Sequence, residues 1–238
     1  MRYQNLRVIL FAAAGLALVG HTGTGGAQSI LATGPDANVT DDGLHRIDPE
    51  IMEAAWIKPD LDLSRFTRIY LVPTAIQFRD VPDKIYDARS RIGVVEFPVD
   101  EERKEWLRTT WRQAVEARFA RETSYGLYDG VATDVLVVHG MLADVVSHIP
   151  PTEPGSFYTF VKDPWIANVV LELRDGSTGE LLARTIDRRH AEGLMDLGTV
   201  WMRTEDLVTR WADVLHRRLD ELSDLLGGRG RGTPEWAR

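Results

Sequence analysis

A long apolar segment, residues 134–149, carries apolar side chains on both of its faces until it reaches Asp144. Alternation with a period of two is typical of a β-strand, and apolar groups on both faces indicate a strand buried inside a sheet. Pro150 and Pro151 then end the strand, because proline cannot donate a hydrogen bond to a sheet ladder. The sequence therefore predicts one long central strand as the framework of the domain.

Three shorter segments predict further strands. Residues 68–73 form an apolar, β-branched run bounded by proline, and residues 165–174 alternate as a half-buried strand does. Residues 181–190 fit helical spacing as well. We favour a strand there because a tight turn precedes the segment and the β-branched pair Thr185 and Ile186 prefers extended backbone.

Two other segments repeat apolar residues every third or fourth position, which is typical of amphipathic helices. Asp100 can cap the first helix, Thr204 can cap the second, and Gly227 can end the second. The expected apolar stripes are Leu107, Trp111, Val115 and Phe119 in the first helix and Leu207, Trp211, Leu215, Leu219 and Leu222 in the second.

This order of elements predicts an α+β fold, with a mostly antiparallel sheet of four to five strands and two helices packed on one face. We expect a signal peptide at 1–27, an N-terminal arm at 28–58, a single α+β domain at 59–226 and a disordered tail at 227–238.

The expected signal peptide begins with Arg2 and Arg7, followed by an apolar run and small residues that favour cleavage near Ala27. The apolar run is about a dozen residues long, short of the roughly 20 that cross a bilayer. We therefore expect a periplasmic or secreted protein with no integral membrane span in the mature chain.

Charge and composition exclude several classes of function. The formal net charge is −8, and cleavage after Ala27 would remove two arginines and leave about −10, which repels the phosphates of nucleic acids. The chain has no cysteine, so disulfides, thiolate catalysis, cysteine metal sites and a lipid-acceptor cysteine are all excluded.

Residues 174–180, RDGSTGE, raise three alternatives: a phosphate loop, a calcium loop and a hairpin turn. A phosphate loop needs a lysine after its last glycine, where this chain has Glu180. A calcium loop needs more acids than Asp175 and Glu180. We predict a hairpin turn in which Gly176 and Gly179 adopt positive φ.

Asp144 is the strongest candidate for a functional polar residue, because a carboxylate on an apolar strand needs a partner. Arg184 and Arg188 share one face of a neighbouring strand and Asp187 lies on the other, which gives the hypothesis of a cross-sheet ion pair from Asp144 to one of these arginines. A purely structural pair near the sheet edge is the main alternative.

No catalytic constellation stands out, and we expect no catalytic residue, metal site or cofactor. His139, His148 and His190 fall on separate predicted strands without the spacing of a zinc site. Aromatic residues away from the helical stripes are candidate surface anchors for a partner. These are Trp56, Phe78, Tyr86 and Trp106.

Four segments resemble a family of bacterial lipoproteins known as domain of unknown function 3313: PDLDLSRFTRIYLVP, DVLVVHGMLADVVSHIPP, LELRDGSTGELLARTIDRR and WADVLHRRLDEL. They span residues 59–222, and each is a pattern of strands and turns without a catalytic signature. The resemblance implies an envelope protein and no known reaction. Family members commonly carry a lipobox cysteine, which this chain lacks, and that difference favours a soluble periplasmic form.

The leading hypothesis is a non-enzymatic interaction or envelope-assembly accessory module whose partner is another envelope protein. One alternative is an acid-dependent hydrolase of cell-envelope material, with Asp144 and Asp187 as its carboxylates. A second alternative is a small-ligand binder, which requires a cavity beside the sheet.

Overall fold

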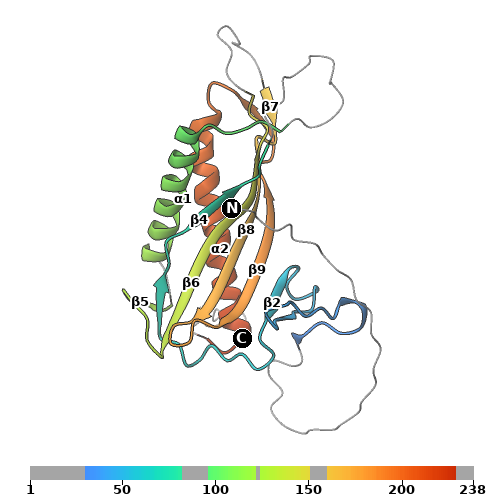
Figure 1. Ribbon diagram of the computed structural model, residues 1–238, viewed down its shortest axis with the longest axis vertical. Helices are drawn as coiled ribbons and strands as arrows, with labels where there is room; N and C mark the ends of the chain where they lie inside the picture. The colour runs from blue at the N-terminus through green and yellow to red at the C-terminus, as the bar shows by residue number, and fades with distance from the viewer. Residues whose placement is uncertain (1–29, 82–95, 122–123, 151–159, 229–238) are drawn as a thin grey trace, which may run out of the picture.

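The computed structural model describes residues 30–81, 96–121, 124–150 and 160–228 (Figure 1). The expected signal peptide, Tyr86 and residues 229–238 of the expected tail lie outside these ranges. The described strands are β1 (His45–Arg46), β2 (Ala55–Ile57), β3 (Arg68–Leu71), β4 (Ala75–Phe78), β5 (Gly126–Leu127), β6 (Val135–Ser147), β7 (Phe160–Lys162), β8 (Trp165–Asp175), β9 (Leu181–His190) and β10 (Leu194–Asp196), and the α-helices are α1 (Glu101–Arg121) and α2 (Val200–Leu225).

The fold is α+β, as predicted, and β6 is the long inner strand of the main sheet. The sheet has 8 strands in the order β1-β2-β9-β8-β6-β3-β5, with β4 also paired to β6. The expected sheet of four to five mostly antiparallel strands is therefore wrong in size and in pairing. Strands β6, β8 and β9 are antiparallel neighbours, whereas β3 and β4 both run parallel to β6.

The parallel pairing follows from the position of α1 in the chain. A helix between two strands carries the chain back to the end where the first strand began, so the next strand runs in the same direction. Helix α1 connects β4 to the strands that follow it, and β6 therefore lies parallel to β3 and β4. The hydrophobic pattern of each strand does not predict this crossover, because it is the same for parallel and antiparallel neighbours.

The additional strands come partly from the segment expected to be an N-terminal arm. Strand β2 pairs antiparallel with β9, with Ala55 opposite Thr185, and β1 pairs with β2 at the edge of the sheet. The side chains of Leu44, Ile47 and Ile57 are fully buried. Burial of these apolar side chains stabilises the docking of the segment on the sheet. The polar, turn-rich composition of the segment did not predict this docking.

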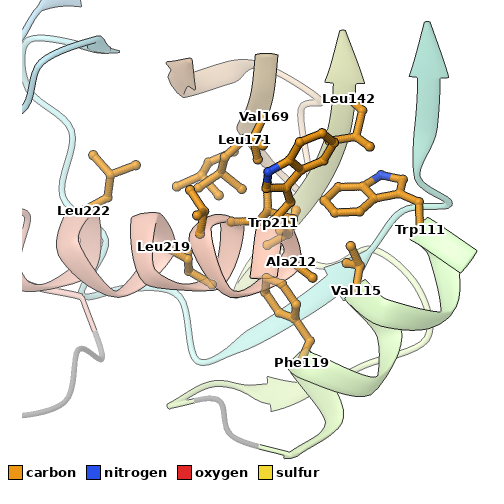
Figure 2. Close-up of a cluster of buried hydrophobic side chains, with 14 of the residues drawn as sticks. Trp111, Val115, Phe119, Leu142, Val169, Leu171, Trp211, Ala212, Leu219 and Leu222 are labelled. Atoms are coloured by element: carbon orange, nitrogen blue, oxygen red, sulfur yellow. The ribbon is translucent and has the colours of Figure 1, made fainter. Parts of the chain in front are cut away.

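Both helices pack on one face of the sheet, as predicted (Figure 1). All four residues of the predicted α1 stripe are buried, and so are all five of the α2 stripe. Figure 2 shows Trp111, Val115 and Phe119 of α1 pointing toward Trp211 and Ala212 of α2. The core lies between these two helices and the sheet.

The helix ends confirm two of the three predicted signals. The backbone N–H of Arg103 donates to Oδ1 of Asp100 at 2.8 Å, and Gly227 adopts a φ of 70° just after α2 ends. The third signal is wrong, because α2 begins at Val200 and Thr204 lies inside it. The hydroxyl of Thr204 donates to the Val200 carbonyl and accepts from Trp165 Nε1 at 2.9 Å.

The predicted turn between β8 and β9 is present, but its two glycines serve different purposes. Gly179 has a φ of 72°, as expected. Gly176 does not have positive φ; instead, a Cβ there would lie 2.5 Å from the backbone oxygen of Val135. Close approach of another backbone is a common second reason for glycine.

Among the described residues, neither helix is long and apolar enough to cross a lipid bilayer.

Candidate functional site

Asp144 lies at an irregularity in the central strand. The register between β6 and β8 shifts between Ala143 and Val146, and Asp144 has a φ of 53°. Aspartate is one of the few non-glycine residues that tolerate this left-handed conformation. A bulge of this kind redirects the side chains around it, and here it places the Asp144 carboxylate beside Arg79, which follows β4.

Arg79 joins two carboxylates. Its Nε donates to Oδ1 of Asp144 at 2.7 Å, its Nη2 pairs with the second oxygen of Asp144, and its Nη1 donates to Oε1 of Glu96 at 2.5 Å. The hydrogen bond from Arg79 lowers the pKa of Asp144, and the charge of Arg188 adds to this effect. Asp144 thus has an arginine partner, but the partner is Arg79 rather than the expected Arg184 or Arg188.

A pocket of about 630 Å³ adjoins this ion-pair cluster at the end of the sheet, where β6 ends and β7 and β8 begin. Glu96 belongs to both features, because it lines the pocket and binds Arg79. We call this cavity the sheet-end pocket. Its lining residues are Glu96, Phe97, His148, Pro150, Phe160, Val161, Lys162, Asp163, Ile166 and His190.

His148 is largely buried in the wall of the sheet-end pocket. Its Nδ1 lies 2.7 Å from the backbone carbonyl oxygen of Asp163, which has a φ of 47°. A carbonyl oxygen only accepts hydrogen bonds, so Nδ1 must carry the proton of this bond. The bond ties the end of β6 to the connection between β7 and β8.

The charged groups of the sheet-end pocket are unevenly paired. The Glu96 carboxylate binds Arg79, and Oδ1 of Asp163 accepts from the backbone N–H of Gly193 at 3.2 Å. The side chains of Lys162 and His190 are exposed and make no hydrogen bond or ion pair with any residue in the described ranges. Lys162 and His190 therefore have hydrogen-bond donors that no residue in the described ranges uses.

Exposed apolar side chains lie around the same end of the molecule. Phe160 and Leu194, on the paired strands β7 and β10, are 55% and 63% exposed, and Met202 near the start of α2 is 68% exposed. Next to them, Trp201 packs edge-on against Trp106 and Trp165. Figure 1 shows β7 at the end of the molecule where both helices begin. Large exposed apolar patches are a common feature of protein contact surfaces.

Of the other members of the predicted polar network, Arg184 and Asp187 bind different partners, whereas Arg188 is close enough to Asp144 for its charge to lower the pKa of that carboxyl. Arg184 donates to Glu172 on the neighbouring strand at 2.7 Å and 2.9 Å. Asp187 accepts from Arg218 of α2, so it lies on the helix-covered face of the sheet. Arg188 is exposed and, as the next residue along the strand, points to the opposite face. The predicted network is therefore divided among three local groups, which centre on Asp144, Arg184 and Asp187.

The candidate surface aromatics fall into different environments. Trp56 is half-buried on β2, and Phe78 is half-buried beneath Lys104 and Arg108 of α1. Trp106 is 37% exposed and packs edge-on against Trp201.

A second pocket, of about 440 Å³, lies at the opposite end of α1 beside β5. The ring of Tyr128 in its wall is covered by the guanidinium of Arg68, which also binds Asp134. Its two acids, Glu116 and Asp129, are exposed and make no hydrogen bond or ion pair with residues in the described ranges. Within the described ranges, no group of three or more histidine, aspartate or glutamate side chains is placed to hold a metal ion.

Lys162, His190 and Glu96 were not predicted as a site. They come from three separate segments of the chain, and each is an ordinary surface residue in its own sequence context. The sequence predicts separate strands for His148 and His190, yet both residues line one pocket because β6 and β9 flank β8.

Acidification is expected to destabilise the protein through carboxylates such as Asp175. Burial opposes the charged form of Asp175, but hydrogen bonds from Ser177 and Arg65 outweigh it and lower the pKa of this carboxyl. Because the folded pKa is depressed, the stabilisation is complete above the unfolded value of about 3.9 and is lost as the pH falls through the folded value.

The variant Asp175→Asn tests this dependence because it keeps an oxygen for the turn and removes the charge. We expect it to be less stable near neutral pH and to lose less further stability than the parent between about pH 5 and pH 3. Urea unfolding at each pH measures both effects. Asp60→Asn, at an exposed position, is the control and should leave the pH profile unchanged.

Searches with this sequence find no matching family model and no matching curated protein. Solved structures with similar chain traces include the PelC dodecamer from Paraburkholderia phytofirmans, at 12% identity and a TM-score of 0.29, covering 66% of this chain and 92% of that one. A neuraminyllactose-binding hemagglutinin homolog from Helicobacter pylori has 7% identity and a TM-score of 0.36, covering 71% and 91%. A hypothetical protein from Chlamydia trachomatis has 10% identity and a TM-score of 0.31, covering 68% and 96%. Similarities of this size carry no argument about function.

Proposed function

We propose that this chain is an exported, non-enzymatic binding protein of the bacterial cell envelope that contacts a partner protein through the end of its sheet. The observation that carries the proposal is the sheet-end pocket bordered by the exposed side chains of Phe160 and Leu194. A concave site next to exposed apolar residues is the common form of an interaction surface.

The state of the acidic residues supports binding over hydrolysis. A pair of catalytic carboxylates must face the same substrate. Asp187 binds Arg218 on the helix-covered face, while Asp144 binds Arg79 and is close enough to Arg188 to be affected by its charge. The two carboxylates therefore face opposite sides of the sheet, and each is neutralised by an arginine.

Export is supported by the N-terminal sequence and by the resemblance of residues 59–222 to the lipoprotein family named above. Arg2 and Arg7 precede a short apolar run, and small residues follow it up to Ala27. The absence of cysteine from the whole sequence favours a form without a lipid anchor.

Site-specific photocrosslinking in intact cells tests the proposed contact surface. A benzophenone amino acid at Leu194 is expected to give a discrete adduct with one envelope protein, because this side chain is exposed beside the pocket. The same probe at Gln113, exposed on α1, is the control and should give no such adduct. Adding Phe160→Glu to the Leu194 probe should reduce the yield, since a charge opposes apolar contact.

Equal crosslinking from Leu194 and Gln113, or none from either, would contradict the proposed surface.

Mass spectrometry of the exported protein tests the export step separately. We expect a mature chain that begins near Gln28, and an uncleaved chain that stays in the cytoplasm would contradict export.

A further inference from the structure

The sheet-end pocket combines two acids, Glu96 and Asp163, with Lys162 and two histidines. The protein carries a formal net charge of −8, yet the polar side chains of this pocket that lack partners in the described ranges, Lys162 and His190, are basic. An exposed lysine beside an acid normally forms an ion pair where geometry allows. Here Glu96 is bound by Arg79 and Oδ1 of Asp163 accepts from the backbone N–H of Gly193, and neither acid pairs with Lys162.

The walls of the pocket are largely apolar. Phe97, Pro150, Phe160, Val161 and Ile166 line it together with the basic groups. A volume of about 630 Å³ falls within the range of 300–1,000 Å³ that is usual for small-molecule sites. Apolar walls with a few polar groups at defined positions are the usual composition of such sites.

From this combination we infer that the sheet-end pocket binds a small organic anion, a carboxylate or phosphate attached to an apolar chain. Lys162 and His190 contact the anionic head, and Phe97 and Ile166 contact the apolar part. This inference rests on the proposed function, because it names a ligand for the same surface. Arg188 lies two residues before His190 on one face of β9, so it extends the positive charge beyond the pocket.

The rest of the pocket provides rigidity for this ligand. His148 fixes the wall through its bond to the Asp163 carbonyl, and Arg79 offsets part of the negative charge of Glu96. Within the described ranges, the carboxylate of Glu96 and the ammonium of Lys162 are not paired with each other. A pocket that is preorganised in this way loses less entropy when a ligand binds.

Calorimetric titration of the full-length mature protein with octanoate and with octyl phosphate tests the inference. We expect saturable binding of at least one of these anions and at least about tenfold weaker binding of octanol, which has the same chain without the charge. If only one anion binds, the result identifies the head group as a carboxylate or a phosphate. Equal binding of octanol and both anions, or no binding of either anion, would overturn the inference.

Two substitutions locate the anion within the pocket. Lys162→Gln and His190→Gln each remove a basic group from an exposed position, and we expect each to weaken anion binding, Lys162→Gln by about tenfold. Arg112→Gln removes a positive charge from the exposed side of α1 and should leave binding unchanged. Equal weakening by all three variants would show a net-charge effect and would refute the assigned site.

The outcome for the ligand is separable from the outcome for the proposed function. Crosslinking from Leu194 without anion binding would leave the partner surface intact and refute the ligand. Anion binding that depends on Lys162, without an adduct from Leu194, would support the ligand and refute the protein partner.

Discussion

Replacing Trp111 by alanine is expected to lower the free energy of unfolding by about 3–5 kcal/mol, the range found when a large aromatic side chain is removed from a core. Trp111 is fully buried between α1, α2 and the sheet, where Figure 2 shows it beside Trp211 and Leu142. Its removal leaves a cavity that two helices and a sheet cannot close without losing other contacts. Urea unfolding, followed by far-UV circular dichroism, measures the loss.

Trp106→Ala is the matched control on the same helix. Trp106 is 37% exposed and packs edge-on against Trp201, so its loss should cost only about 1 kcal/mol. Trp111→Phe should fall between the two, because it keeps most of the ring and removes an indole N–H that has no partner among the described residues. Similar losses for Trp106→Ala and Trp111→Ala would contradict the packing described above.

Replacing Asp187 by asparagine should produce the second large effect, a loss of about 2–3 kcal/mol. The side chains of Asp187 and Arg218 are only 9% and 18% exposed, and the bond from Asp187 raises the pKa of Arg218. Without the carboxylate, a largely buried guanidinium keeps only Glu221 as a charged partner among the described residues. Urea unfolding again measures the change.

Asp144→Asn is the comparison that separates a buried ion pair from an exposed one. Asparagine tolerates a φ of 53°, so the substitution changes the charge without adding backbone strain. The side chains of Asp144 and Arg79 are 42% and 35% exposed, and solvent screening should keep the loss below about 1 kcal/mol. High salt should abolish most of the Asp144 effect and little of the Asp187 effect. A larger loss of unfolding free energy for Asp144→Asn than for Asp187→Asn would contradict this ranking.

The predictions that succeeded concern features encoded within one segment. The stripe of α1 residues from Leu107 to Phe119 was correct because helical spacing alone decides which side chains share a face. The strand at Leu181–His190 was correct because β-branched residues and an adjacent turn both favour extended backbone. The failures concern the relation between segments. The sequence of β3 predicts a strand whether its neighbour is parallel or antiparallel. The crossover through α1 decides that β3 and β6 are parallel.

The candidate site shows the same division. Asp144 stood out in the sequence because a carboxylate interrupted an apolar strand, but Arg79 lies 65 residues away and no local pattern connects the two. Lys162 on β7 and His190 on β9 line one pocket only because the tertiary structure brings these two strands together. Pairing across the sheet also placed Asp187 against α2 rather than beside Asp144.

Local sequence was sufficient for the α+β class, the buried helical faces and the hairpin turn, because hydrophobic period and turn chemistry act over a few neighbouring residues. The mixed sheet, the docking of residues 45–57, the partners of each carboxylate and the sheet-end pocket arose only in the tertiary structure. Each of these depends on which distant segments come into contact, and that is decided by the total burial of apolar surface and the pairing of buried polar groups across the whole domain.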